Sequence, residues 1–337
     1  MAYKAVVVGA GGISNAWFPP LIQEKVEIAG IVDLRLEAAK GKAERYKLDT
    51  MTSTDLTSVL KQTQPDFVVD LTVPEAHCEV ACTAMKMDCH VIGEKPMAAS
   101  MAEARRMVRV AEETGMLYMV SQSRRWNPRH EAIHKFLKSG KLGVVTTINC
   151  DFYLGVHFGG FREEMPSPLI LDMSIHHFDL ARYMSQLDPM AVYAKEFNPK
   201  GSWYKGDVAA SCIFEMSNGV IFTYRGSWCA EGFTTSWEGN WRIIGERGTL
   251  LYENDELPMI QVLAGKPGVH LKDLPLPKAT LKYSGMHGAL REMLTFLRTG
   301  KRPQTECHDN IKSLAMVFGV VESSKRGRRM PVTGLEK

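Results

Sequence analysis

The first strand of the chain and the turn that follows it constrain the fold more than any other stretch. Residues 4–9, KAVVVG, form a short apolar run, and Gly9, Gly11 and Ser14 then make the pattern GxGxxS. A strand without polar alternation is typically buried on both faces, as in a parallel sheet covered by helices. A glycine turn between such a strand and a helix can hold the pyrophosphate of a dinucleotide. The opening therefore predicts a Rossmann-type βαβ unit.

The rest of the first third repeats this alternation of buried strands and helices. Strands are predicted at 26–33, 66–71, 90–95 and 117–122, and helices at 36–46, 76–87 and 101–114. Parallel strands joined by helical crossovers build a doubly wound sheet. We therefore predict an α/β fold with a dinucleotide-binding Rossmann domain over residues 1–122.

After residue 123 the pattern changes to that of an α+β domain. A helix at 125–143 precedes a long strand at 144–155, hairpins at 208–228 and 241–253, and helices at 287–299 and 308–325. Hairpins join antiparallel strands, so residues 123–337 are predicted to form a substrate and oligomerisation domain with a mostly antiparallel sheet. The C-terminal helices can pack back on the first domain.

Asp33 ends the second predicted strand and favours NAD as the cofactor. A carboxylate at this position can accept hydrogen bonds from both ribose hydroxyls of adenosine, and it repels a 2′-phosphate. Arg35, two residues further on, weakens this preference, so NADP stays open as an alternative.

Lys95 lies in the stretch GEKPMA (93–98), directly after a predicted strand. Ligands of open parallel sheets bind at the carboxyl ends of the strands, which places this cation near the cofactor. Pro96 stiffens the loop and can adopt a cis bond. A solvated lysine beside a turn proline is the structural alternative.

The stretch SPLILDMSIHHFDLARY (167–183) carries two acids and two histidines. On a regular helix capped by Ser167, the side chains of Asp172, His176 and Asp179 share one side, and His177 points away. Diverging histidines without clustered ligands predict no metal site. A histidine is suited to remove the proton of a hydroxyl at neutral pH, and Asp172 can orient it. A polar patch at a domain interface is the structural alternative.

Three motifs together resemble the Gfo/Idh/MocA oxidoreductases: TVPEAH at 72–77, EKP at 94–96, and DxxxHxxD from Asp172 to Asp179. The resemblance extends from about residue 3 to residue 327. It implies that Lys95, Asp172 and His176 are catalytic and that the substrate is a sugar, cyclitol or related polyol. The implied cofactor-binding residues are Gly9, Gly11, Gly12, Ile13, Asp33, Arg35, Thr72, Pro74, His77, Glu94, Lys95 and Pro96.

The predicted reaction is hydride transfer between NAD and a ring hydroxyl or the corresponding ketone. An NAD-dependent glycosidase that uses transient oxidation, and a non-enzymatic regulator that senses a dinucleotide or sugar, are the alternatives. The residues considered as substrate contacts are Arg124, Trp126, His157, His177 and Trp237. The loop 154–162 precedes the histidine helix and is a candidate lid.

Composition narrows the partners and the compartment. The chain has 41 basic and 38 acidic residues, so its net charge of +3 favours neither nucleic acid nor an anionic membrane. There is no apolar span of about 18 residues, which argues against a transmembrane helix. Seven scattered cysteines indicate free thiols in the cytoplasm. We expect a homo-oligomer, either a dimer or a tetramer, with a small-molecule substrate.

Overall fold

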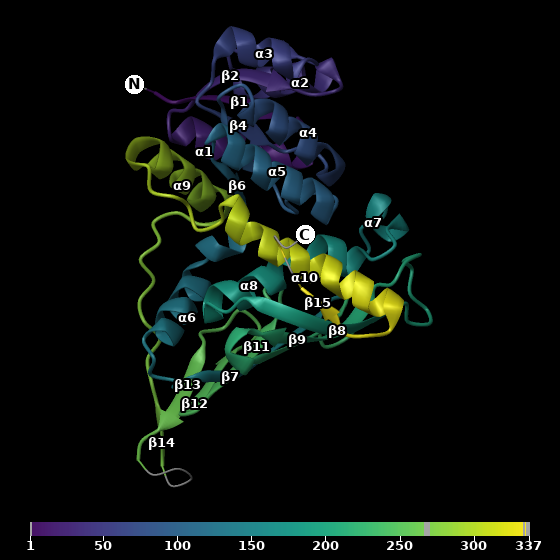
Figure 1. Cartoon of the computed structure of the whole chain (residues 1–337), viewed down its shortest axis with the longest axis vertical. Coiled ribbons are helices and arrows are strands. Elements are labelled where there is room, and N and C mark those ends of the chain that lie inside the picture. The colour runs from purple at the N-terminus through teal and green to yellow at the C-terminus, as the bar shows by residue number, and fades with distance from the viewer. Residues whose placement is uncertain (1, 266–269, 333, 335–337) are drawn as a thin grey trace. The chain divides into compact units, whose positions relative to one another are not determined.

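The computed structural model describes residues 2–265, 270–332 and 334, and the chain forms two compact units (Figure 1). Unit 1 comprises Met1–Trp126 and Lys282–Leu314, and unit 2 comprises Asn127–Leu281 and Ala315–Lys337. The chain thus leaves unit 1 after Trp126 and returns to it near its end. The boundary drawn at residue 122 from the sequence stays a prediction.

Unit 1 contains the predicted Rossmann fold. Its six parallel strands have the order β3-β2-β1-β4-β5-β6, which is that of a dinucleotide-binding sheet. The strands are β1 Lys4–Val8, β2 Glu27–Val32, β3 Met51–Ser53, β4 Phe67–Asp70, β5 His90–Gly93 and β6 Tyr118–Val120. The sequence did not predict β3, a three-residue edge strand whose side chains are all only partly buried.

The helices of unit 1 follow the strands and are ended by local sequence signals. They are α1 Phe18–Gln23, α2 Leu36–Tyr46, α3 Leu56–Thr63, α4 Pro74–Met85, α5 Met101–Thr114 and α9 Gly285–Thr299, with 3₁₀ turns at Gly12–Ala16 and Ser123–Trp126. The hydroxyl of Ser100 caps α5 by accepting from Glu103 N, and Gly115 ends it at φ +71°. Both α2 and α5 lie where they were predicted, α5 with a capping serine and a terminal glycine and α2 with no side-chain cap.

Unit 2 is built on one nine-stranded sheet with the order β14-β13-β12-β11-β7-β10-β9-β8-β15. Its strands are β7 Val145–Tyr153, β8 Pro189–Phe197, β9 Ala209–Met216, β10 Ile221–Ser227, β11 Asn240–Gly245, β12 Gly248–Tyr252, β13 Met259–Leu263, β14 Leu271–Asp273 and β15 Met330–Pro331. All neighbouring pairs are antiparallel except β7 and β10. Both predicted hairpins are present, as β9–β10 and β11–β12.

Helices cover one face of this sheet (Figure 1). They are α6 Pro128–Lys138, α8 Ile175–Ser185 and the second part of α10 Cys307–Arg326, while the short α7 spans Phe161–Glu164. On the helix-covered side, Phe152, Phe214, Phe222 and Tyr224 are fully buried. The hydroxyl of Ser323 on α10 accepts a hydrogen bond from Ala194 N of β8, which fixes that helix to the sheet edge.

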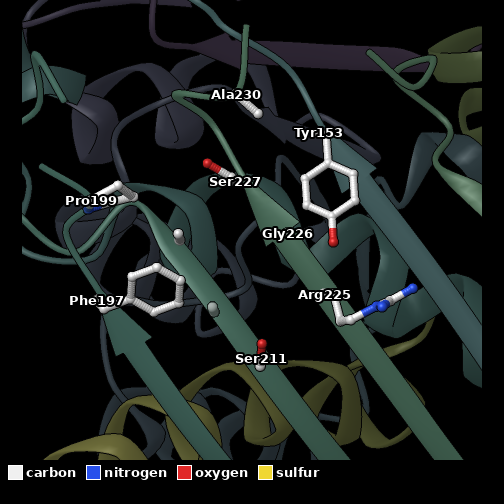
Figure 2. A pocket seen from close by; sticks show the side chains of 10 residues that line it. Tyr153, Phe197, Pro199, Ser211, Arg225, Gly226, Ser227 and Ala230 are labelled. Carbon is white, nitrogen blue, oxygen red and sulfur yellow. The ribbon is translucent and has the colours of Figure 1, made fainter. Parts of the chain in front are cut away.

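The opposite face of the sheet carries exposed apolar side chains. Tyr193 and Phe197 on β8, Ile213 on β9 and Ile221 on β10 are each more than a third exposed. A shallow hollow of about 210 Å³ lies on this face, with Tyr153, Phe197 and Arg225 among its lining residues (Figure 2). The alternation of buried and exposed residues along β8–β10 is that of a sheet with one covered face.

No helix in the part of the chain that the structure describes is long and apolar enough to cross a membrane.

Candidate active site

The glycine turn after β1 has the shape that a dinucleotide requires. Gly9 has φ +97°, and a Cβ there would lie 2.6 Å from the carbonyl oxygen of Leu71, so only glycine fits. At Gly11 and Gly12 an added Cβ would meet no atom within 4 Å, so the backbone surface is open to a ligand. The Ser14 side chain is buried and donates to Gly11 O at 2.7 Å, which closes the turn. The turn therefore fits a pyrophosphate.

Asp33 fixes the shape of the same turn. Its Oδ2 accepts a hydrogen bond from Ala10 N at 2.8 Å, and its Oδ1 accepts one from Arg35 N at 2.9 Å. A carboxylate oxygen accepts more than one hydrogen bond, so both oxygens keep capacity for ribose hydroxyls. The side chain of Ile13 is 39% exposed beside the turn, and Arg35 is exposed.

The loops after β4 and β5 are tied together by His77. Its Nδ1 lies 2.9 Å from the carbonyl oxygen of Pro96, and its Nε2 lies 3.1 Å from that of Thr72. His77 is fully buried near the start of α4, whose first residue is Pro74. The ring thus joins two loops that carry predicted cofactor residues, and its nitrogens are already engaged by the backbone.

Asp70 supports the first of these loops. Its only signal in the sequence is that it is an acid at the end of an apolar strand. Its Oδ1 accepts from the hydroxyl of Thr72 at 2.6 Å and from Thr72 N at 3.1 Å. Burial raises the pKa of Asp70, against the influence of His77 and of both hydrogen bonds. The carboxyl group therefore helps to hold the end of β4.

The EKP loop is anchored through Glu94. Its side chain is 7% exposed and accepts a hydrogen bond from Trp17 Nε1 at 2.8 Å. Burial raises the pKa of Glu94, although Trp17 and Lys95 act in the opposite direction. The Lys95–Pro96 peptide bond is cis, as the sequence suggested. Lys95 thus stands at the carboxyl edge of the parallel sheet, on a loop held by buried contacts.

The stretch that carries Asp172 and His176 differs from the regular helix expected from the sequence. Residues Leu169–Ser174 form a π-helical turn, and α8 begins only at Ile175. The first turn has no side-chain cap. Ser167 hydrogen-bonds Glu196 instead. The predicted cap was wrong because the partner of Ser167 lies on another element, which the local sequence cannot reveal.

The four polar residues of this stretch have different environments. Asp172 and His176 are partly exposed, whereas His177 and Asp179 are buried. The ring of His177 packs on Phe152, with ring centroids 4.7 Å apart, and its Nε2 lies 3.3 Å from the carbonyl oxygen of Trp237. His177 therefore belongs to the aromatic core of unit 2. This placement agrees with the expectation that the side chains of His176 and His177 point in different directions.

Arg162 is a site residue that the sequence did not single out. Its Nε donates to Asp172 Oδ2 at 2.6 Å. The two residues are ten positions apart and separated by a turn, so no local spacing rule connects them. The only signal in the sequence would have been an arginine shortly before an acid-containing helix.

The aromatic substrate candidates are divided between exposed and buried positions. In unit 2, Trp237 is 44% exposed, and His157 stacks on Trp203 with centroids 3.7 Å apart. In unit 1, Trp126 is 2% exposed and packs on Gly288 of α9, a placement that favours a core role. Arg124 is partly exposed in the same 3₁₀ turn as Trp126.

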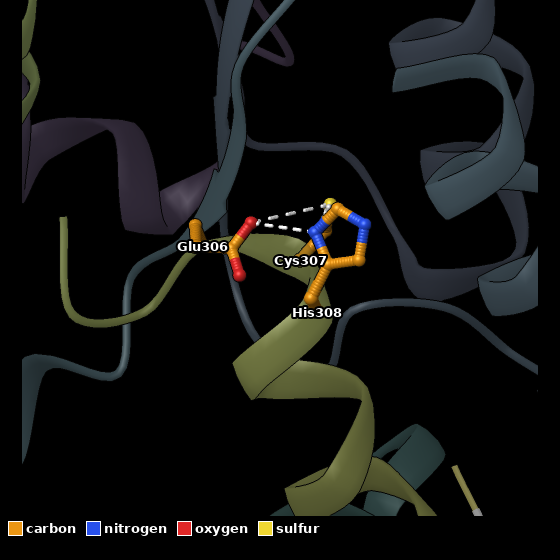
Figure 3. A group of neighbouring side chains, drawn as sticks. All are labelled: Glu306, Cys307 and His308. Atoms are coloured by element: carbon orange, nitrogen blue, oxygen red, sulfur yellow. Dashed lines mark hydrogen bonds and ion pairs between the residues drawn. The ribbon is translucent and has the colours of Figure 1, made fainter. Parts of the chain in front are cut away.

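Among the described residues, Glu306, Cys307 and His308 group closely enough to hold a metal ion (Figure 3). Burial raises the pKa of Cys307 to about 12, which disfavours the thiolate that a metal needs. Burial alone would lower the pKa of His308, but hydrogen bonds to Glu306 and Glu112 raise it. Ion pairs of a protonated His308 with Glu306 and Glu112 explain why these side chains lie close together, and no metal ion is needed to explain it.

Fold and loops together define a nicotinamide-dinucleotide oxidoreductase, and comparison with known proteins gives the family. The NAD-binding Rossmann model of the GFO_IDH_MocA oxidoreductase family matches residues 3–122, and the GFO/IDH/MocA C-terminal domain matches residues 130–251. The chain belongs to the Gfo/Idh/MocA family. It is an enzyme of the oxidoreductase class, and its cofactor is NAD.

Full-length relatives and solved structures agree with this assignment. D-apiose dehydrogenase of Paraburkholderia graminis is 25% identical, over 99% of this chain and 91% of its own. 1,5-Anhydro-D-fructose reductase of Ensifer adhaerens is 26% identical, over 98% of each chain. An Agrobacterium radiobacter oxidoreductase in complex with NAD⁺, L-tartaric acid and magnesium has a TM-score of 0.86 at 21% identity, over 98% of this chain and 99% of its own.

Proposed function

We propose that the chain transfers hydride between NAD and a ring hydroxyl or ketone of a sugar, cyclitol or related polyol. The observation that carries the proposal is the environment of His176. It remains partly exposed on α8, while the neighbouring His177 and Asp179 are buried in the core of unit 2. The two relatives named above act, by their names, on sugars or sugar derivatives.

The roles of the chain's own residues follow from their chemistry. We propose that His176 removes the hydroxyl proton, because a neutral imidazole is a base at neutral pH. Asp172 orients that base, and Lys95 hydrogen-bonds the substrate oxygen and stabilises developing negative charge. Gly9, Gly11 and Asp33 hold NAD, which supplies the hydride acceptor. A reaction in the opposite direction uses the same groups with His176 as the acid.

A panel of aldoses, their lactones, inositols and glycosides, each mixed with NAD⁺ or NADH and followed by NADH absorbance and by release of the aglycone, tests this function. We expect substrate-dependent formation or loss of NADH with at least one compound. Cleavage of a glycoside that requires NAD⁺ without net NADH formation would point instead to glycoside elimination through transient oxidation. The absence of both activities across the panel would contradict the proposal.

Asp33 is expected to set the preference for NAD over NADP. Asp33→Ser removes the negative charge that repels a 2′-phosphate, so the ratio of the dissociation constants for NADPH and NADH should fall by about tenfold, which corresponds to about 1.4 kcal/mol. Fluorescence titration with both cofactors measures the ratio. Because Asp33 also accepts from Ala10 N and Arg35 N, Asp33→Asn serves as a control that keeps an acceptor. Stronger binding of NADPH by the parent chain would overturn the assignment.

We propose a homo-oligomer that forms through the open face of the unit 2 sheet. Tyr193, Phe197, Ile213 and Ile221 form an exposed apolar strip there, beside the hollow of Figure 2. Apolar patches of this kind mark protein interfaces, and two copies of one face bury each other in a two-fold dimer.

Ile213→Glu places a charge in the middle of this strip, so it should convert the oligomer to a monomer. Light scattering after size exclusion measures the mass. Leu257→Glu is the control, because Leu257 is 78% exposed in a loop outside the strip, and this variant should keep the parent mass. A parent chain that is monomeric at micromolar concentration would refute the proposal.

We also propose that the protein resides in the cytoplasm. All seven cysteines of the chain are free thiols, which is typical of proteins in a reducing compartment.

A further inference from the structure

An ion pair connects α7 (Phe161–Glu164) to the π-helical turn at Leu169–Ser174. Arg162 Nε lies 2.6 Å from Asp172 Oδ2, and the side chains are 34% and 16% exposed. A pair with this degree of burial is screened less by salt and solvent than a surface pair. The charge of Arg162 therefore acts directly on the carboxylate that neighbours His176 along the helix.

The segment that presents Arg162 is held by backbone hydrogen bonds within unit 2. The carbonyl oxygen of Glu163 accepts from Lys205 N at 2.9 Å, and that of Pro166 accepts from Asp207 N at 2.8 Å. A Cβ on Gly206 would lie 2.2 Å from the carbonyl oxygen of Met165, so the two segments are in close backbone contact. Arg162 is therefore attached to a fixed turn.

The guanidinium is also oriented by aromatic rings. Its central carbon lies 5.1 Å from the ring centre of Phe158 and 4.7 Å from that of Phe161. A guanidinium is favoured at this distance because its positive charge is attracted to the face of the ring. Loop, rings and carboxylate together hold the cation at Asp172 and leave little freedom for other arrangements.

We propose that Arg162 is a positioning residue, which neutralises and orients Asp172 for proton transfer by His176. Asp172 and His176 are four residues apart, about one helical turn, so a charge on one is felt by the other. The inference rests on the proposed function, because only a proton-transferring His176 gives this charge a consequence for the reaction rate.

Several other charged groups on elements packed against α8 have partners elsewhere. On α6, His130 lies 3.4 Å from Glu238, Glu131 pairs with Lys135, and His134 bonds the carbonyl oxygen of Tyr183. On β7, Asp151 pairs with Arg225. On α8 itself, Arg182 pairs with Asp188 and Asp179 is buried. Arg162 is thus a cation paired with Asp172, and its removal changes the charge beside that turn by one unit.

Arg162→Gln should raise the pKa of His176. Without the arginine, Asp172 loses one neutralising positive charge, and a nearby negative charge stabilises the imidazolium, by on the order of one pKa unit. Asp172→Asn should lower the pKa, because it removes the negative charge and leaves the positive one. NMR titration of the histidine ring signals measures both shifts in the NADH-bound protein, with His176→Asn used for assignment.

Two further variants separate this role from a structural one. Arg162→Lys keeps the positive charge and should leave the His176 pKa near that of the parent. Lys205→Gln breaks an exposed ion pair between Lys205 and Glu164 of α7, so it loosens the same segment without touching Asp172. It should also leave the pKa unchanged. The acid limb of the kcat/KM profile should move with the pKa, to higher pH in Arg162→Gln.

An unchanged His176 pKa in both Arg162→Gln and Asp172→Asn would overturn the inference. So would a rise in KM for anionic substrates with no pKa shift, because Arg162 would then bind substrate directly. The NMR readout does not depend on turnover. A shifted pKa in a chain without dehydrogenase activity would contradict the proposed function and leave the coupling intact, whereas full activity with no shift would contradict only the inference.

Discussion

Replacing His176 by alanine is expected to lower kcat by roughly 10²–10⁴-fold, the usual effect of losing a general base. The affinity for NAD should stay near that of the parent, because Gly9, Gly11 and Asp33 lie in unit 1 and His176 lies in unit 2. Steady-state kinetics with the substrate found in the panel, together with a fluorescence titration of NADH, separate the two effects. The pH profile of kcat/KM should lose a limb near neutrality.

The Lys95→Ala variant tests whether the two residues serve the same reaction. We expect a loss of similar size, with some loss of cofactor affinity. The double variant should lose less than the product of the two single losses, since groups that act as a unit are not additive. A His176→Ala chain that stays folded and turns over substrate at the parent rate would refute the proposed mechanism.

His134→Gln is the structural control for this comparison. His134 of α6 bonds the carbonyl oxygen of Tyr183 and stacks on its ring, with centroids 4.7 Å apart. Its replacement should weaken packing between α6 and α8 and leave the proposed proton transfer in place. A loss of kcat as large as that of His176→Ala would mean that any disturbance of α8 abolishes activity.

Local signals were sufficient for most of the fold. The helices predicted at 36–46 and near 101–114 are present, because amphipathic spacing is clear in both and Ser100 and Gly115 bound the second. Strand β3 was missed because three partly buried residues carry no pattern, and the edge strand β14 because its three residues are all exposed. Strand β13 was missed although its residues alternate between exposed and buried. The return of residues 282–314 to unit 1 was only anticipated in general terms, since it depends on packing between distant segments.

Candidate site residues could be predicted where they directly follow a strand. They could not be predicted where they depend on contacts between distant segments. The glycine turn and Asp33 were proposed from their spacing around predicted strands, whereas the role of Lys95 in the EKP loop depended on the family resemblance. The π-helical turn at Leu169–Ser174 has no sequence signal, because its residues are equally suited to an α-helix. The pairing of Asp172 with Arg162 and that of Ser167 with Glu196 join separate elements, so only the folded chain reveals them.

Glu196 is a buried acid of β8 whose charge should cost stability at neutral and alkaline pH. Its side chain is 4% exposed, and its Oε1 accepts no hydrogen bond from any described residue. Burial raises its pKa to about 7, helped by Asp207 and opposed by Ser167 and Lys195. The folded chain therefore holds a proton that the unfolded chain releases near its ordinary value of 4.5. Stability falls as the pH rises between these two values.

Replacing Glu196 by glutamine removes this cost, because an amide does not ionise. At pH 8 the free energy of unfolding should rise by about 3 kcal/mol, and near pH 4.5 it should change little. Urea unfolding at both pH values, followed by tryptophan fluorescence, measures the difference. Glu215→Gln is the matched control on the neighbouring strand, where a hydrogen bond from Arg329 lowers the pKa of the exposed acid. That variant should lose a little stability at pH 8, the opposite sign. An equal effect of Glu196→Gln at both pH values would show that burial does not raise the pKa of the Glu196 carboxyl group.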